Sequence, residues 1–130
     1  KEFLVKYDNS KQSVSELSGG NVQKLIVGRE FDYDPDLLIM NQPTRGIDVG
    51  AIEFIRKKIV DMRARKKAIL LVSADLSEIL SLSDTILVMH EGRIVGHISD
   101  VKNTSENDLG LYMLGVKEDS KEQIGGAYCE

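Results

Sequence analysis

The sequence is poor in cysteine, proline and aromatic residues, with 1 Cys, 2 Pro and no Trp among 130 residues. The single cysteine, Cys129, cannot form an internal disulfide bond, which excludes a disulfide-stapled scaffold. The longest apolar runs, at 37–40 and 68–72, have the length of a strand and fall well short of the ~20 residues of a membrane-spanning helix. No basic segment followed by an apolar one opens the sequence, so no signal peptide is expected.

Charge of either sign is not concentrated in any part of the chain. The 17 Lys+Arg and 21 Asp+Glu residues give a formal net charge of −4 and are spread along the sequence. This distribution argues against a basic surface for nucleic acid or anionic lipid. A chain of 130 residues, 42% of them hydrophobic, can bury the core of one domain at most. Because the first residue is Lys, we expect a piece of a longer protein.

Short apolar runs alternate with segments of helical periodicity along the chain. Such an alternation is typical of a layered α/β fold with a mostly parallel sheet and flanking helices. Two buried strands make a thin sheet, so further strands are expected upstream. The expected elements are a helix at 21–29 after an N-cap at Ser18, buried strands at 37–40 and 68–73, a helix from Asp48 to about Arg65, a short helix after Asp75, a hairpin of 85–89 and 93–98, and a last helix opened by Ser105 and Asp108.

The segment Leu17-Ser18-Gly19-Gly20-Asn21 is the first candidate for chemistry. It lies at the start of a helix, where unpaired backbone N–H groups and about half a positive charge favour binding of a phosphate. The glycines allow a ligand to approach the backbone, and the serine adds a hydroxyl donor. The alternative is a glycine-rich helix cap without a ligand.

Two further motifs follow along the sequence, each formed by an apolar strand and the polar loop after it. The strand at 37–40 runs into Asn41-Gln42 and a Pro-Thr-x-Gly-x-Asp loop, and the strand at 68–72 runs into Ser73-Ala74-Asp75. Over residues 10–116 this order resembles the second half of an ATP-binding-cassette (ABC) nucleotide-binding domain, a P-loop NTPase. The matching segments are the signature motif Leu17–Asn21, the Walker B strand Leu37–Gln42, the D-loop Gly46-Ile47-Asp48 and the switch loop Ser73–Asp75.

Three sequence features indicate which group of ABC proteins the chain resembles most. Asn21, the stretch PTRGIDVGA and the stretch LGLYMLGV at 109–116 are most similar to ATP-binding subunits of bacterial importers of simple sugars and nucleosides. Those subunits carry two cassettes in one polypeptide, and this chain resembles the C-terminal part of the second. The resemblance implies a cassette portion over 1–116. From Lys117 the chain turns polar and contains Gly125-Gly126, which predicts a flexible polar tail at 117–130.

The chain departs from the family pattern by having no G-x-x-x-x-G-K-[ST] loop. The resemblance therefore implies that this chain has no principal ATP site and does not bind the nucleotide tightly alone. It also implies that a phosphate-loop strand is missing between the Walker B strand and the strand at 68–72. In its absence we expect self-association, a swapped element, or direct pairing of these two strands.

A second departure concerns the catalytic positions. An active cassette has Asp at the position of Asn41, Glu at that of Gln42 and His at that of Ala74. A neutral amide is a poor partner for Mg²⁺, so no metal is assigned to Asn41. Gln42 can orient a water but cannot accept its proton, and Ala74 offers no hydrogen bond. Each replacement is expected to cost ~10²-fold or more in rate, which predicts a degenerate site and an inactive isolated chain.

The resemblance assigns a role to the intact signature motif. Cassettes pair head to tail, so Leu17–Asn21 would face the γ-phosphate of ATP on the N-terminal cassette of the same subunit. Ser18 would donate through Oγ, Gly19, Gly20 and Asn21 through backbone N–H, and Asp48 would help to couple the two sites. The full subunit would hydrolyse ATP with Mg²⁺ at the cytoplasmic face of the bacterial plasma membrane. Its partners would be permease subunits and, indirectly, a solute-binding protein.

Two other classes of function compete with this hypothesis. A DNA-repair-type ABC ATPase head predicts long heptads and a Walker B glutamate, neither of which occurs. A non-catalytic interaction or regulatory domain could keep a cassette-like fold without using ATP. The remaining charged clusters, including residues 63–67, fit a solvated helix face and its C-terminal turn, so no nucleic-acid partner is expected. His90 and His97 are expected as surface or turn residues.

Overall fold

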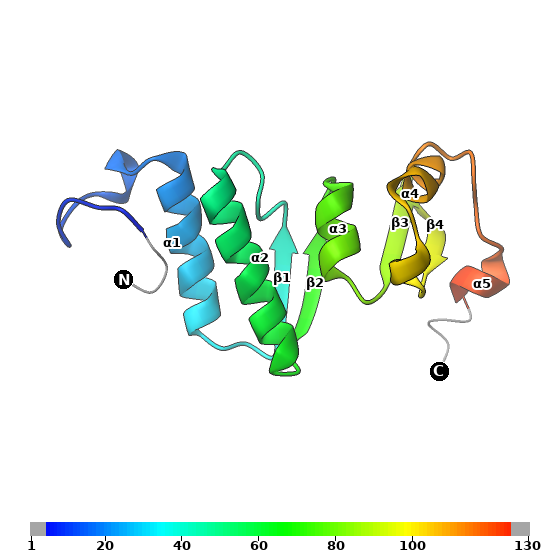
Figure 1. The fold of residues 1–130 in the computed structure, drawn as a ribbon, viewed down its shortest axis with the longest axis horizontal. Coiled ribbons are helices and arrows are strands. Elements are labelled where there is room, and N and C mark those ends of the chain that lie inside the picture. Colours follow the sequence, from blue (N-terminus) through cyan, green and yellow to red (C-terminus); the bar gives the residue numbers. More distant parts are fainter. Residues whose placement is uncertain (1–4, 126–130) are drawn as a thin grey trace. The chain divides into compact units, whose positions relative to one another are not determined.

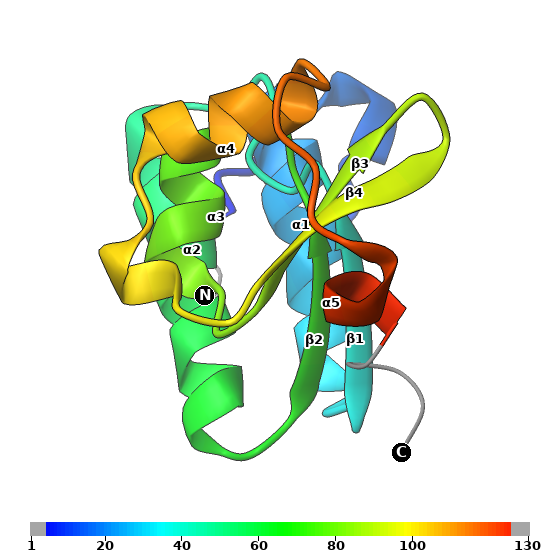
Figure 2. The same ribbon diagram turned by 90° about the vertical axis from the view of Figure 1, so that its right-hand side faces the viewer.

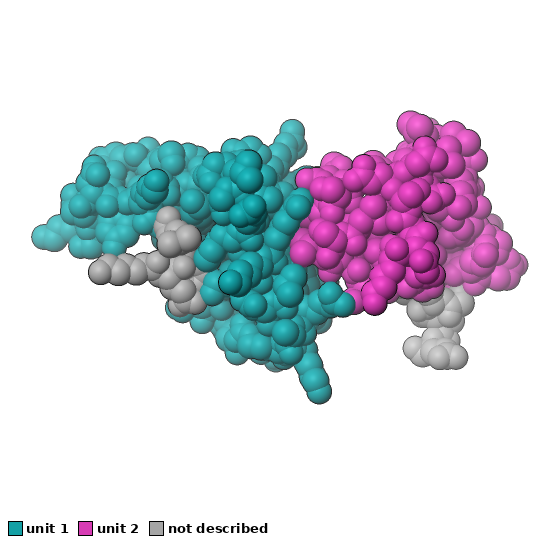
Figure 3. Space-filling view, viewed as in Figure 1, with its two compact units in different colours: residues 1–73 teal, residues 74–130 magenta. Residues whose placement is uncertain are grey.

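The computed structural model describes residues 5–125 of the chain. It divides into two compact units, Lys1–Ser73 and Ala74–Glu130, which are coloured separately in Figure 3. Each unit is described by itself below. None of the helices formed by the described residues has the length and apolar character needed to cross a bilayer.

The first unit is a parallel β-α-β arrangement preceded by a helix. The strands β1 and β2 pair in parallel, with Leu37 opposite Ala68 and Asn41 opposite Val72. The helix between them provides the crossover that a parallel pair requires, and the preceding helix lies beside it (Figure 1). The elements are η1 Val14–Glu16, α1 Gly19–Asp32, β1 Leu37–Asn41, α2 Val49–Ala64 and β2 Ala68–Val72.

The core of this unit lies on one face of the sheet. The sequence predicts strands buried on both faces, and this prediction is wrong for β1 and β2. Ile39 is 64% exposed and Leu70 is 52% exposed, while Leu38 and Met40 are buried. Apolar runs do not reveal which face is covered, because every position in them is apolar. The buried hydrophobic residues of the unit are Val27, Phe31, Leu38, Met40, Ala51, Ile55, Ile59 and Met62.

Helix α1 buries only some of its apolar residues. Leu25 and Ile26 are 40% and 44% exposed, whereas Val27 and Phe31 are buried. The helix has apolar residues on two sides, so the periodicity does not select one of them. The start of the helix is confirmed, because Ser18 is its N-cap and the glycine pair forms its first turn.

Strands β1 and β2 pair directly with each other. This is one of the three outcomes that the sequence predicts for the sheet. Hydrogen bonds extend the β1–β2 ladder at both ends, from Ala68 N to Asp36 O at 2.9 Å and from Gln42 N to Val72 O at 2.8 Å. No strand lies between them among residues 5–125. Self-association of the chain stays a prediction.

The second unit is an antiparallel hairpin with helices around it; α4 contacts both strands of the hairpin, and Figure 2 shows β3 and β4 running side by side. The predicted turn is confirmed, with Glu91 and Gly92 at φ 46° and 76° between the strands. The predicted start of the last helix is also confirmed: Ser105 is the N-cap of α4, and Ser105 and Asp108 form a capping box in which each side chain accepts from the other's backbone N–H. The elements are α3 Leu76–Leu82, β3 Ile86–His90, β4 Arg93–Ile98, η2 Val101–Asn103, α4 Glu106–Met113 and α5 Lys121–Gly125.

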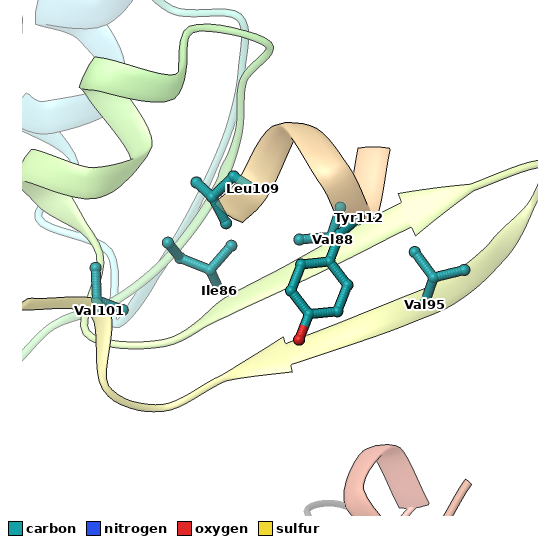
Figure 4. Packing of buried hydrophobic residues seen from close by; sticks show 6 residues of the cluster. All are labelled: Ile86, Val88, Val95, Val101, Leu109 and Tyr112. Carbon is teal, nitrogen blue, oxygen red and sulfur yellow. The ribbon is translucent and has the colours of Figure 1, made fainter. Parts of the chain in front are cut away.

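The hydrophobic core of the second unit forms where α4 packs on the hairpin. Leu109 and Tyr112 of α4 face the strands, and Leu109 is 1% exposed (Figure 4). Gly96 is required in this packing, because a Cβ there would lie 2.8 Å from Cδ1 of Tyr112. The buried cluster is Ile86, Val88, Val95, Val101, Leu109 and Tyr112.

Where the sequence predicts a flexible polar tail, residues 121–125 form α5, and Asp119 forms hydrogen bonds with β4. Asp119 accepts from Tyr112 Oη at 2.6 Å and from His97 N at 2.8 Å, and its own N–H donates to Val95 O. Burial and the contact with Asp119 raise the pKa of Tyr112 to about 12. Burial alone would raise the pKa of Asp119, but the hydrogen bonds from Tyr112 and His97 outweigh it and the pKa is lowered. Residues 126–130 of the predicted tail lie outside the described residues.

Leu109 in α4 and Leu114, the C-cap residue of the same helix, provide a matched pair for testing this core. Leu109 is 1% exposed and Leu114 is 72% exposed. Leu109→Ala is expected to lower the free energy of unfolding by about 2–5 kcal/mol, because it leaves a cavity. Leu114→Ala is expected to change it by less than about 0.5 kcal/mol, because its side chain is already in water. Urea unfolding of both variants measures the difference, and equal effects would contradict the packing.

Candidate functional site

Ser18 and Gly19 of the signature turn (Leu17–Asn21) are exposed, and its other three residues are half-buried. Ser18 makes no side-chain cap hydrogen bond. Its Oγ instead accepts from Asn21 Nδ2 at 3.0 Å, and Lys6 N donates to Asn21 Oδ1 at 2.9 Å. Because Ser18 Oγ accepts this bond, its own O–H proton is available to a ligand.

The backbone of the signature turn adds further donors. The first helical hydrogen bond runs from Val22 N to Ser18 O at 2.9 Å. The N–H groups of Gly19, Gly20 and Asn21 precede it, so no carbonyl of the helix can accept from them. Three backbone donors and one hydroxyl thus occur together at the positive end of a 14-residue helix, which suits an anion such as a phosphate.

Asn41 and Gln42 lie at the carboxyl end of β1, where ligands of parallel α/β sheets bind. Gln42 has φ 50°, in the left-handed region that non-glycine residues adopt rarely. Its N–H donates to Val72 O, and its C=O accepts from Arg45 N at 3.2 Å. The two side chains at this edge are amides, so neither can accept a proton at neutral pH. Among the described residues no group of three or more His, Cys, Asp or Glu side chains could hold a metal ion.

Asp48 links the loop after β1 to helix α2. Its side chain accepts from Ala51 N at 2.9 Å and so caps the helix, as the sequence predicts, and the loop reaches it through Gly46 at φ 73°. The hydrogen bond from Ala51 and the charge of Lys24 lower the pKa of Asp48, against the effect of desolvation. The carboxylate is therefore ionised at neutral pH.

The same carboxylate lies against the signature turn. A Cβ on Gly20 would lie 3.2 Å from Asp48 Oδ2, and Lys24 Nζ lies 3.8 Å from the same oxygen. A second connection runs from Gln23 Nε2 to Pro43 O at 3.1 Å. The structure thus brings together the signature turn and the D-loop, which the sequence identifies as separate motifs.

Ala74, which occupies the position of the switch-loop histidine, lies at the boundary between the two units. Ser73 ends the first unit and Ala74 begins the second, so the structure does not place Ala74 relative to Gln42. Ala74 is exposed and carries only a methyl group. Asp75 caps α3 by accepting from Glu78 N at 3.0 Å, as the sequence predicts.

Sequence reasoning missed Gln23 and Lys24. Both are polar residues of α1 that contact the loop between β1 and α2. The side chain of Lys24 is only 12% exposed, which is unusual for lysine. The sequence contains no local signal for these contacts, because their partners lie some twenty residues away.

Comparison with solved structures identifies the fold. The ATP-binding subunit of an ABC transporter matches 78% of this chain and 45% of its own chain, with a TM-score of 0.69 and 22% identity. A nucleotide-free ATP-binding cassette from an ABC transporter matches 88% of this chain and 42% of its own, with a TM-score of 0.58 and 22% identity. The fold is therefore part of the P-loop ATPase fold of ABC cassettes.

Curated relatives define the family more closely, although no protein-family model matches the chain. The guanosine import ATP-binding protein NupO of Bacillus subtilis is 47% identical over 125 residues, covering 96% of this chain and 24% of the relative. The nucleoside import ATP-binding protein NupA of Lactococcus lactis is 50% identical over 114 residues, covering 88% and 22%. The ribose import ATP-binding protein RbsA of Clostridium perfringens is 41% identical over 111 residues, covering 85% and 22%.

The chain is therefore a homologue of ABC-type ATP-binding proteins for nucleoside and sugar import, and it corresponds to a C-terminal segment of such a subunit. It spans about a quarter of the length of the curated relatives it matches.

The two glycines of the signature turn differ in a way that can be measured. A Cβ on Gly19 would meet no atom within 4 Å, whereas one on Gly20 would press on Asp48. Gly19→Ala is expected to stabilise the chain by about 0.4–1 kcal/mol, because alanine restricts the unfolded chain. Gly20→Ala is expected to give a smaller gain or a loss and to shift the Ala51 amide resonance, because Asp48 must move. Urea unfolding and amide spectra test this, and identical behaviour of the two variants would contradict the contact.

Proposed function

We propose that this chain is part of the ATP-binding subunit of an importer for nucleosides or simple sugars, from the C-terminal part of its second cassette. Its function there is to present the signature turn to ATP held by the partner cassette, the N-terminal cassette of the same subunit. The proposal rests on one combination of features. The signature turn has hydrogen-bond donors available to a ligand. The end of β1 has amides where an active cassette has carboxylates.

The chemistry of the signature turn is binding without proton transfer. The γ-phosphate would accept hydrogen bonds from the Ser18 hydroxyl and from the backbone N–H groups of Gly19, Gly20 and Asn21. The hydrogen bond from Asn21 to Ser18 Oγ orients the hydroxyl. These donors and the helix dipole stabilise the negative charge that develops during phosphoryl transfer.

The segment's own catalytic edge does not fit ATP hydrolysis. Asn41 would offer Mg²⁺ one neutral oxygen, and the metal prefers carboxylates and phosphates. Gln42 cannot act as a general base, and the methyl group of Ala74 cannot contact a phosphate as a histidine would. ATP and Mg²⁺ are therefore assigned to the partner cassette's phosphate loop. No step of the reaction is assigned to a metal at this segment.

The proposed solute class and partners rest on what the relatives are named for. Two of them are named for import of guanosine or nucleosides, and another for import of ribose. An importer needs permease subunits and a solute-binding protein, and its ATP-binding subunit works at the cytoplasmic face of the membrane. We propose these partners and this location for the full subunit.

The proposal predicts a large effect of Ser18→Arg in the full subunit assembled with its permease. The arginine side chain would fill the space of the γ-phosphate and remove the hydroxyl donor, so kcat for ATP hydrolysis is expected to fall by about 10²-fold or more. The matched control is Ser15→Arg, because Ser15 is exposed in η1 and lies outside the signature turn. Steady-state ATPase assays measure both.

Unchanged ATPase activity in Ser18→Arg would contradict the proposal and would favour a non-catalytic interaction domain. An equal loss in Ser15→Arg would also contradict it, because the effect would then not be specific to the signature turn.

A further inference from the structure

The side chain of Lys24 connects the signature helix to the D-loop. It projects from the second turn of α1, and its Nζ lies 3.8 Å from Asp48 Oδ2. The Lys24 side chain is 12% exposed and the Asp48 side chain is 63% exposed. Burying an amine is costly unless its charge is compensated. The ion pair with Asp48 compensates the charge of Lys24.

Asp48 is itself fixed in position. Its Oδ1 accepts from Ala51 N at 2.9 Å, which ties the carboxylate to the first turn of α2. Its Oδ2 lies toward both Lys24 and Gly20, and a Cβ at Gly20 would be 3.2 Å away. One oxygen thus serves the helix cap and the other faces the signature turn. A displacement of Asp48 would change the environment of Gly20 directly.

A second hydrogen bond supports the same connection. Gln23 Nε2 donates to Pro43 O at 3.1 Å, and Pro43 directly follows Gln42. Adjacent residues of α1 therefore contact both ends of the loop that joins β1 to α2. Since the loop begins at the degenerate catalytic edge and ends at Asp48, its position and that of the signature turn are linked.

We propose that Lys24 is a positioning residue that maintains the position of the signature turn relative to the D-loop. In that position the donors of Ser18, Gly19 and Gly20 can bind the phosphate that is transferred. This inference rests on the proposed function and deepens it. Lys24 does not touch the phosphate. It acts through Asp48 on the placement of donors, and small displacements of such groups have large effects on rate.

The test uses the full subunit assembled with its permease. Lys24→Met keeps the length of the side chain and removes its charge, and Lys24→Arg keeps the charge. We expect Lys24→Met to lower kcat by about 10-fold or more while the Kd for ATP, measured without turnover, changes by less than about 2-fold. Lys24→Arg is expected to recover most of the activity. Lys57→Met, an exposed lysine of α2, is the matched control.

A double-mutant cycle assigns the effect to Asp48. Asp48→Asn keeps an oxygen that can cap α2 and removes the charge that Lys24 faces. If the pair acts as a unit, Lys24→Met combined with Asp48→Asn is expected to be no slower than the slower single variant. Multiplying effects would overturn the proposed route through Asp48.

The outcomes separate this inference from the proposed function. Loss of activity in Ser18→Arg together with full activity in Lys24→Met would overturn the inference and leave the proposed function intact. Full activity in Ser18→Arg would overturn the proposed function. Equal losses in Lys24→Met and Lys24→Arg, or a parallel rise in the Kd for ATP, would indicate a general structural defect and would overturn the positioning role.

Discussion

The carboxylate of Asp48 is the constraint on which the arrangement of the candidate site depends. It closes the first turn of α2 through Ala51 N, it faces the amine of Lys24, whose side chain is 12% exposed, and it lies against Gly20 of the signature turn. The hydrogen bond from Ala51 and the charge of Lys24 lower its pKa, so it is ionised at neutral pH. A single charged group therefore connects the start of the crossover helix with the signature turn.

The two sides of the site have different chemistry. The signature turn offers Ser18 Oγ and backbone N–H groups, which bind an anion without proton transfer. The carboxyl end of β1 offers the amides of Asn41 and Gln42, which cannot supply a general base or a strong ligand for Mg²⁺. Such a segment can complete an ATP site whose metal and phosphate loop belong to another cassette. This division of roles is the one that the proposed function requires.

Much of the fold could be predicted from the sequence, because local signals determine where its elements begin. Ser18, Asp48 and Ser105 each lie at the helix start that their side chains predict, and Glu91-Gly92 forms the predicted turn. Burial was harder to predict. Ile39 is exposed because coverage of a sheet face depends on neighbouring elements that an apolar run does not describe. The motifs of the site could be identified, but the contacts of Lys24 and Gln23 could not, because they join residues distant in sequence. The roles of Asn41, Gln42 and Ala74 stay predictions.

In the proposed function, this chain supplies half of an ATP site and holds no nucleotide by itself. The most direct test is a calorimetric titration of Mg-ATP into the isolated chain, followed by the same titration in the presence of an intact N-terminal cassette. We expect no binding to the isolated chain below about 1 mM, and tighter binding by the cassette when the chain is present. Micromolar binding by the isolated chain would contradict the proposed function, because some group other than a phosphate loop would then hold the nucleotide.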